Sequence, residues 1–186
     1  MPQEVRLPPC IRHITTHQPD GKSVFANARA PQYFHVPKLG HMARSYAVEG
    51  FPVKVEEDVD LLKFESGKGR TGYHRQNIVV PNGSNFVVLD FEPGGETVLH
   101  QTVSVDLAVC TNGTLQHKLD SGQVVTLKPG DHIVQRGTMH KWVNPSSTKP
   151  ARLVAAIISC EPFLVGNEIL KEIHIPHTEA KMAAKL

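Results

Sequence analysis

The sequence predicts an all-β protein built as one antiparallel barrel or jelly roll, and its length, strand pattern and turns carry that prediction. At 186 residues the chain is long enough for one well-buried domain. From Asn85 onward, short β-rich runs alternate with turns rich in Gly, Pro, Asn and Asp. Hairpin turns between successive runs are typical of antiparallel sandwiches and barrels. The expected strands are 86–91, 97–110, 114–119, 124–127, 132–134, 141–143 and 152–159.

The segments on either side of these runs are expected to be accessory to the barrel, which we place at 81–165. Residues 1–80 contain scattered Pro and Gly and only short strand-like runs such as 51–55, so they predict an irregular arm packed on the barrel. Residues 166–186 predict a short C-terminal helix and tail, because 168–173 has helical character and the end is rich in Ala and Lys.

Composition and charge exclude several classes of function. The chain has 40% apolar residues, 20% charged residues and a formal net charge of +2, as ordinary globular proteins do. Lys and Arg are scattered and are not interleaved with aromatic residues, so no nucleic-acid partner is expected. No run approaches the roughly 18 apolar residues of a membrane span, and the start lacks the apolar region of a secretory signal. We therefore expect a cytoplasmic protein with no membrane partner.

The cysteines and the last residues also bear on the compartment. Cys10, Cys110 and Cys160 are odd in number and form no CxxC pair, which favours reduced thiols over a disulfide framework or a thiolate zinc site. The ending Ala184-Lys185-Leu186 resembles the small-basic-Leu variants of the peroxisomal address. Such an ending also arises by chance, so a peroxisomal location is the alternative.

One stretch of the predicted barrel carries glycine and polar residues at the spacing of a known sequence motif. Gly94 is followed by five residues and then by His100, Thr102 and Asp106, and Asp106 is followed by six residues and then by Gly113. This pattern resembles the first motif of the cupin superfamily, which reads Gly, five residues, His-x-His, three or four residues, Glu, six residues, Gly. Thr102 stands where that motif has its second His, and Asp106 stands where it has Glu.

The second cupin motif is matched further along the chain. Gly137, two residues, His140, three residues and Asn144 are in place, while Gln135 replaces the usual Pro. The likeness runs from about residue 11 to about residue 160 and resembles a subgroup of small single-domain cupins found among fungal and bacterial metabolite enzymes. This resemblance implies a double-stranded β-helix fold and leaves the reaction open. By analogy with small cupins, it also implies a homodimer.

Strand geometry predicts that the motif residues face one another. Alternate side chains of a strand share a face, so if Ala108 faces the barrel interior, His100 and Asp106 do too. By the same parity, His140 and Trp142 share a face. Since these two strands meet at the mouth of a cupin barrel, the resemblance implies that two imidazoles and a carboxylate come together in an apolar cavity.

Two chemistries follow for His100, His140 and Asp106. As acid/base catalysts, the two imidazoles would exchange protons near neutral pH, with Asp106 orienting one of them. As metal ligands, the same three residues would supply the two His and one carboxylate of an iron or zinc site. Thr102 in place of a ligand weighs against the metal, so no cofactor is expected and a divalent Fe or Zn ion is the alternative.

Four further residues are candidates for contact with a substrate. His117 falls at an interior-facing position of its strand, and Gln135 offers an amide next to the second motif. Thr102 and Trp142 are the other two candidates. Three of the four also have a structural explanation: Thr102 as a strand former, Trp142 as a core residue and His117 as an imidazole at the barrel rim.

We therefore predict a small-molecule enzyme of secondary metabolism. Its substrate would be small, apolar and oxygenated, such as a polyketide-type aromatic compound or an enone. Its reaction would be a proton transfer without redox change: dehydration, decarboxylation or isomerisation, the work of a lyase or isomerase. The alternatives are a metal-dependent dioxygenase and a cupin that binds a small molecule without catalysis.

Overall fold

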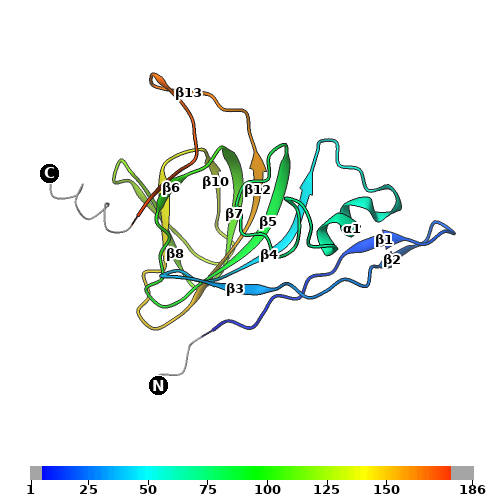
Figure 1. Cartoon of the computed structure of the whole chain (residues 1–186). Helices are drawn as coiled ribbons and strands as arrows, with labels where there is room; N and C mark the ends of the chain where they lie inside the picture. Colours follow the sequence, from blue (N-terminus) through cyan, green and yellow to red (C-terminus); the bar gives the residue numbers. More distant parts are fainter. Residues whose placement is uncertain (1–5, 177–186) are drawn as a thin grey trace.

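The computed structural model describes residues 6–176, and β-strands that form a barrel dominate it (Figure 1). The strands of the larger sheet are β3 (Tyr33–Val36), β4 (Gly40–Glu49), β5 (Gly83–Phe91), β7 (Ser104–Asn112), β10 (His132–Arg136) and β12 (Ala151–Ser159). Those of the smaller sheet are β6 (Leu99–Gln101), β8 (Leu115–Leu119), β9 (Val124–Leu127), β11 (His140–Val143) and β15 (Ile173–Ile175).

The two sheets face each other across the core, which confirms the predicted all-β fold. The larger sheet has the order β10-β7-β12-β5-β4-β3 and the smaller one β15-β6-β11-β8-β9, and the strand pairs within them are antiparallel. The core takes buried side chains from both sheets, so closing the barrel removes the apolar faces of both from water. These side chains are Leu39, Val87, Phe91, Ala108, Cys110, Leu115, Leu127, Trp142, Ala151, Leu153, Ala155 and Ile157.

The first 80 residues contribute strands to the barrel, which corrects the prediction of an irregular arm. β4 pairs with β5 along its whole length, from Gly40 opposite Phe91 to Glu49 opposite Gly83, and β3 extends the same sheet. The first six residues of β4 are all buried, so both of its faces are covered and the polar–apolar alternation that marks a strand is missing. The run 51–55, expected to be strand-like, is not a strand.

Arg44 of β4 anchors the loop that leads into β5. Its guanidinium, 1% exposed, donates hydrogen bonds to the backbone oxygens of Arg70, Gly72 and Asn77 at 2.8, 3.1 and 2.5 Å. Burial, helped by the nearby charge of Arg75, lowers the pKa of Arg44 to about 10. Because a buried guanidinium is costly unless hydrogen-bonded, these carbonyl groups hold the loop against β4.

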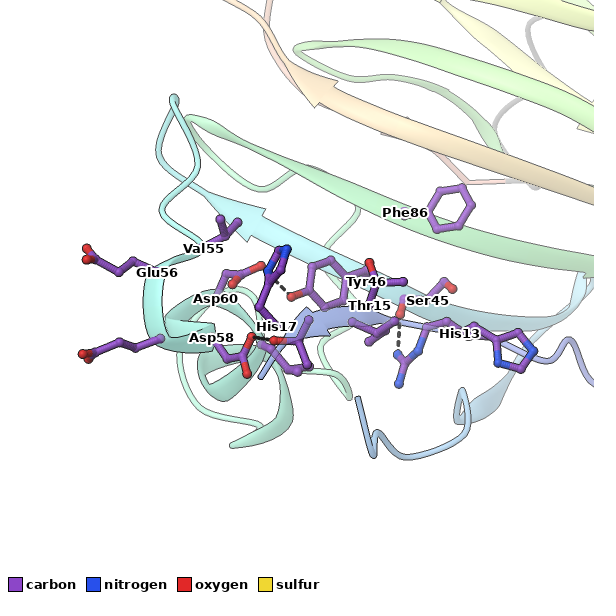
Figure 2. A pocket seen from close by; sticks show the side chains of 15 residues that line it. His13, Thr15, His17, Ser45, Tyr46, Val55, Glu56, Asp58, Asp60 and Phe86 are labelled. Atoms are coloured by element: carbon purple, nitrogen blue, oxygen red, sulfur yellow. Dashed lines mark hydrogen bonds between the residues drawn. The ribbon is translucent and has the colours of Figure 1, made fainter. Parts of the chain in front are cut away.

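A hairpin and a short helix lie against the outside of β4. The hairpin consists of β1 (Thr15–His17) and β2 (Ser23–Phe25), and the short 3-10 turn η1 (Glu56–Asp58) leads into α1 (Val59–Glu65). Figure 2 shows the hollow between them, where Tyr46 donates to Asp60 at 2.7 Å and Thr16 to Asp58 at 2.5 Å. Two of the acidic side chains in this hollow are therefore already paired within the fold.

The C-terminal segment is extended, so the predicted helix at 166–186 is wrong where the structure describes it. β13 (Leu164–Val165) pairs with β14 (Glu168–Ile169) in a hairpin that projects from the barrel, and β15 then pairs with β6 (Figure 1). Leu170, 4% exposed, packs near Gly137 and fastens this segment to the barrel. The Ala- and Lys-rich tail with the ending 184–186 lies outside the described residues. Within 6–176, no helix is long and apolar enough to cross a membrane.

Candidate functional site

A cavity of about 510 Å³ opens into the barrel between the two sheets. Its walls are mainly apolar, with side chains such as Phe34, Met42 and Leu153 from the larger sheet. Six of the predicted site residues line it together: His100, Thr102, Asp106, Gln135, His140 and Trp142. A largely apolar cavity of this size with a few polar groups at one place is typical of small-molecule sites.

The two motif imidazoles lie side by side, as strand parity predicts. His100 of β6 and His140 of β11 are direct partners in the antiparallel pairing of these strands. Their ring centroids are 4.3 Å apart and the rings are inclined by 49°. Strand pairing in the smaller sheet thus fixes the imidazole pair without any help from a loop.

Backbone carbonyl groups fix the tautomer of both rings. Nδ1 of His100 lies 2.8 Å from the oxygen of Val98, and Nδ1 of His140 lies 2.9 Å from that of Thr138. A carbonyl oxygen can only accept, so each Nδ1 carries the hydrogen and each Nε2 keeps a free lone pair when the ring is neutral.

Burial keeps these rings neutral near physiological pH. It lowers the pKa of His100, and together with the neighbouring His100 it lowers that of His140 to about 3. The sequence predicts imidazoles that titrate near neutral pH, and the structure corrects this because both rings are removed from water. The pair presents two hydrogen-bond acceptors rather than a charge.

Asp106 sits at the end of a short chain of hydroxyl groups. Ser104 Oγ donates to Asp106 Oδ1 at 2.7 Å, and Thr102 Oγ1 lies 2.7 Å from Ser104 Oγ. Since the Ser104 hydrogen is committed to Asp106, Thr102 must donate to Ser104. Burial raises the pKa of Asp106 to about 6, and the hydrogen bond from Ser104 only partly opposes it. The charge of this carboxyl group therefore changes close to neutral pH.

Asp106 does not orient either imidazole, which corrects its predicted role. Of the hydrogen bonds and ion pairs within residues 6–176, none joins Asp106 to His100 or His140. The carbonyl groups of Val98 and Thr138 do that work instead. Asp106 is therefore available to a bound molecule.

Two residues of the site escaped sequence reasoning. Ser104 shares strand parity with Thr102 and Asp106, and that parity is the signal that could have found it. His174 of β15 lines the cavity with its ring parallel to that of His100, at 5.7 Å and 3°, and its Nε2 lies 2.8 Å from Glu172 Oε1. His174 was not predicted because a helix was expected in this segment, although the apolar–polar–apolar alternation of Ile173-His174-Ile175 is typical of a strand.

Gln135 and Trp142 form part of the cavity wall. Gln135 lies directly opposite Asp106 in the pairing of β10 with β7, and its amide exchanges hydrogen bonds with Thr138 at 3.0 and 3.3 Å. Trp142 belongs to the buried core, as its structural explanation has it, and also lines the cavity, so contact with a substrate stays a prediction.

His117 is placed differently from the prediction. It is not among the residues that line the cavity, but packs behind it against His140 and Trp142, with ring centroids 4.8 and 4.6 Å away. Only 3% of His117 is exposed, and its Nε2 is buried without a hydrogen-bond partner. Burial, with a contribution from His100, lowers its pKa to about 4. His117 is thus a neutral imidazole with an unsatisfied nitrogen.

The predicted metal ligands are His100, His140 and Asp106. No group of three or more His, Cys, Asp and Glu residues within 6–176 is placed to hold a metal ion. His100 and His140 lie together, and the Asp106 carboxylate accepts a hydrogen bond from Ser104. The three residues do not fit an iron or zinc site in this arrangement.

Comparison with known proteins gives a consistent set of relatives, although no family model matches the chain. "Phomopsin biosynthesis cluster protein D" of Diaporthe leptostromiformis is 34% identical, covering 90% of this chain and 86% of the relative. "Oryzines biosynthesis cluster protein J" of Aspergillus oryzae is 32% identical, covering 91% and 93%. "Cupin-domain-containing oxidoreductase fogC" of Aspergillus ruber is 33% identical, covering 85% and 76%.

Among solved structures, a cupin-2 domain protein of Rhodospirillum rubrum overlaps part of the barrel. It is 12% identical, has a TM-score of 0.42, and the overlap covers 55% of this chain and 64% of that one. The relatives matched by sequence cover far more of both chains. This chain belongs to the same family of cupin-domain proteins as these fungal relatives.

Proposed function

We propose that this protein is a biosynthetic enzyme of secondary metabolism that moves protons, without net redox change, on a small apolar substrate. The observation that carries the proposal is Asp106, a carboxyl group in an apolar cavity whose pKa is raised to about 6. A general acid or base works best when its pKa lies near the operating pH. The names of two relatives refer to biosynthesis clusters, which supports the biosynthetic setting.

The imidazole pair defines what the substrate must offer. His100 and His140 are neutral and can only accept at Nε2, so a bound molecule has to donate hydrogen bonds to them. The remaining walls are mainly apolar and suit a ring or an unsaturated chain. A polyketide-type phenol, or an enone or hydroxyketone of similar size, meets both requirements.

Asp106 acts as the proton carrier in this scheme. As a carboxylate it removes a proton from the carbon next to a carbonyl group, and the carbonyl carbon and oxygen take up the electron pair as an enolate. As the acid it then returns that proton. Given to the oxygen of a leaving β-hydroxyl group, the proton completes dehydration, with water and a new double bond as products. Given to another carbon of the enolate or dienolate, it completes an isomerisation.

His100 and His140 position the substrate by accepting its hydroxyl hydrogens. In a decarboxylation, the third reaction predicted from the sequence, Asp106 would serve only as the acid that protonates the carbanion left by carbon dioxide. None of the three reactions involves a net oxidation or reduction of the substrate, so none needs a redox cofactor.

Deuterium exchange tests the proposal without knowledge of the natural substrate. The probe is 6-hydroxy-2-tetralone, a small and largely apolar ketone whose phenolic hydroxyl group can donate to the imidazole pair. It is incubated in deuterated buffer while NMR follows loss of its α-protons. We expect the protein to accelerate exchange, with a rate that rises through about pH 6 as Asp106 ionises. Asp106→Asn should abolish this acceleration, while Asp120→Asn, an exposed control, should keep it. Equal acceleration by Asp106→Asn, or none by the wild type, would contradict the proposal.

The names of some relatives support a second candidate, an oxidoreductase. "Cupin-domain-containing oxidoreductase" is the description of relatives from Aspergillus ruber and Neurospora crassa. Oxygen uptake during turnover separates the oxidoreductase from the proton-transfer enzyme. The substrate for this measurement is a biosynthetic intermediate purified from a fungus that has a related biosynthesis cluster. Uptake in step with product, abolished under nitrogen, would favour the oxidoreductase, whereas equal turnover under nitrogen favours proton transfer.

A further inference from the structure

A second hollow, of about 770 Å³, opens on the barrel where the two sheets end. β10 is the last strand of the larger sheet and β9 the last strand of the smaller one, and the hollow lies between them. We term it the β9–β10 slot. Its apolar lining comes from Val124 and Val125, from Ile133 and Val134, and from Phe163.

The barrel is open along this slot. Val125 of β9 is paired directly with His117 of β8, so the two side chains share the interior face of the smaller sheet. Nevertheless Val125 is 52% exposed, whereas His117 is 3% exposed. An interior-facing valine that is half exposed marks a gap between the sheets. Val134 and Phe163, 56% and 47% exposed, extend the apolar surface, and such surfaces mark binding sites.

Two polar groups of the slot lack partners. The buried Nε2 of His117 has no hydrogen-bond partner, although buried polar atoms are normally satisfied. Arg136, on the exposed side of β10, lines the slot and makes no hydrogen bond or ion pair with any residue in 6–176. Beside the imidazole pair there is thus a hollow with apolar walls, a cation that has no partner within 6–176, and a lining imidazole whose buried Nε2 is unsatisfied.

We propose that the β9–β10 slot binds a small apolar hydroxy acid. The carboxylate pairs with Arg136, and the apolar body covers Val125, Val134 and Phe163. The hydroxyl group points to the imidazole of His117 and reaches its buried Nε2 when the ring turns toward the slot. The carboxylate and the hydroxyl group each pair with a polar group that has no partner within residues 6–176, and the apolar body covers side chains that are exposed in this part of the chain.

The slot also adjoins the cavity. Gln135 lines both hollows, and the ring of His117 packs against that of His140. An occupant of the slot therefore contacts the rear of the cavity wall. The proposal concerns binding alone and does not depend on the reaction proposed for the cavity, so its test needs no turnover.

Calorimetric titration with three probes tests the slot: ω-hydroxyoctanoate, octanoate and octan-1-ol. We expect the hydroxy acid to bind most tightly and octan-1-ol most weakly. Arg136→Gln should weaken octanoate about tenfold, the usual effect of losing one charge-assisted hydrogen bond, and leave octan-1-ol nearly unchanged. His117→Phe should remove the advantage of the hydroxy acid over octanoate. Lys128→Gln, at an exposed position outside the slot, is the control for charge.

Filling the slot distinguishes it from the cavity. Val134→Trp places a large side chain at an exposed slot position and should prevent binding of all three probes. Both Val134→Trp and Arg136→Gln change exposed residues, so they keep the test valid even if His117→Phe fails to fold. The proposal is wrong if the wild type binds no probe, if Arg136→Gln and Lys128→Gln weaken octanoate equally, or if Val134→Trp leaves octanoate affinity unchanged. A slot closed by a second copy of the chain would give the first of these results.

Discussion

Replacing Asp106 by Asn measures how much the buried Asp106 carboxylate lowers the free energy of unfolding. The pKa of this carboxyl group rises from 3.8 to about 6 on folding, because the group is buried. Between these two values the folded protein holds more protons than the unfolded chain, so the free energy of unfolding falls as the pH rises. The stability contribution is full below the unfolded pKa and is lost as the pH passes the folded pKa. The interval corresponds to about 3 kcal/mol.

The variant Asp106→Asn avoids this cost, since its amide has the same shape, carries no charge and can still accept the hydrogen bond from Ser104. At about pH 8 we expect the variant to be more stable than the wild type by up to about 3 kcal/mol. For a chain of this size, that raises Tm by about 6 to 12 °C. At about pH 4 the two proteins should differ little, because Asp106 is then protonated in the folded wild type.

Calorimetry and circular-dichroism melts at the two pH values provide the assay, with Asp120→Asn as the exposed control. An unchanged or lower Tm for Asp106→Asn at the higher pH would refute the reasoning, and so would an equal gain at both values. A gain that appears only when Asp106 is ionised would show that the fold keeps a costly carboxylate, as functional sites often do.

The remaining predictions use the same variants and methods. His117→Phe should keep or raise Tm, because it replaces an unsatisfied buried nitrogen by carbon. A large decrease in Tm would show that His117 makes a stabilising hydrogen bond. NMR titration should find His140 neutral down to about pH 5, and a midpoint above about 6 would contradict its burial. Leu170→Ala should cost about 2 to 4 kcal/mol in urea unfolding, and an unchanged midpoint would show that Leu170 does not anchor the C-terminal segment. Light scattering should show a homodimer, and a monomer at high concentration would reject it.

The strands that the sequence predicts most accurately are those bounded by turn residues. β9 was predicted at its observed limits and β12 within one residue, because turn residues bound both runs. β4 was missed since it is covered on both faces, and β13 to β15 were missed since short exposed strands leave little pattern. The single run expected at 97–110 is two strands, β6 and β7, which belong to different sheets.

The site was predictable as a set of residues but not as a set of chemical states. Strand parity survives the break between β6 and β7, so it correctly brought His100, Thr102 and Asp106 to one cavity. Their protonation depends on burial by residues distant in sequence, which parity does not report. This is why the neutral imidazoles and the raised pKa of Asp106 emerge only from the fold.

The central claim is that Asp106 carries a proton near neutral pH, and carbon NMR of its carboxyl group tests that most directly. A titration of selectively labelled protein from about pH 3 to about pH 8, assigned with Asp106→Asn, gives the midpoint for this one group. The account predicts a midpoint near 6, with the signal still protonated at about pH 5. A midpoint near 4, the value of a solvated aspartate, would show that the cavity does not hold the proton and would contradict the proposed function.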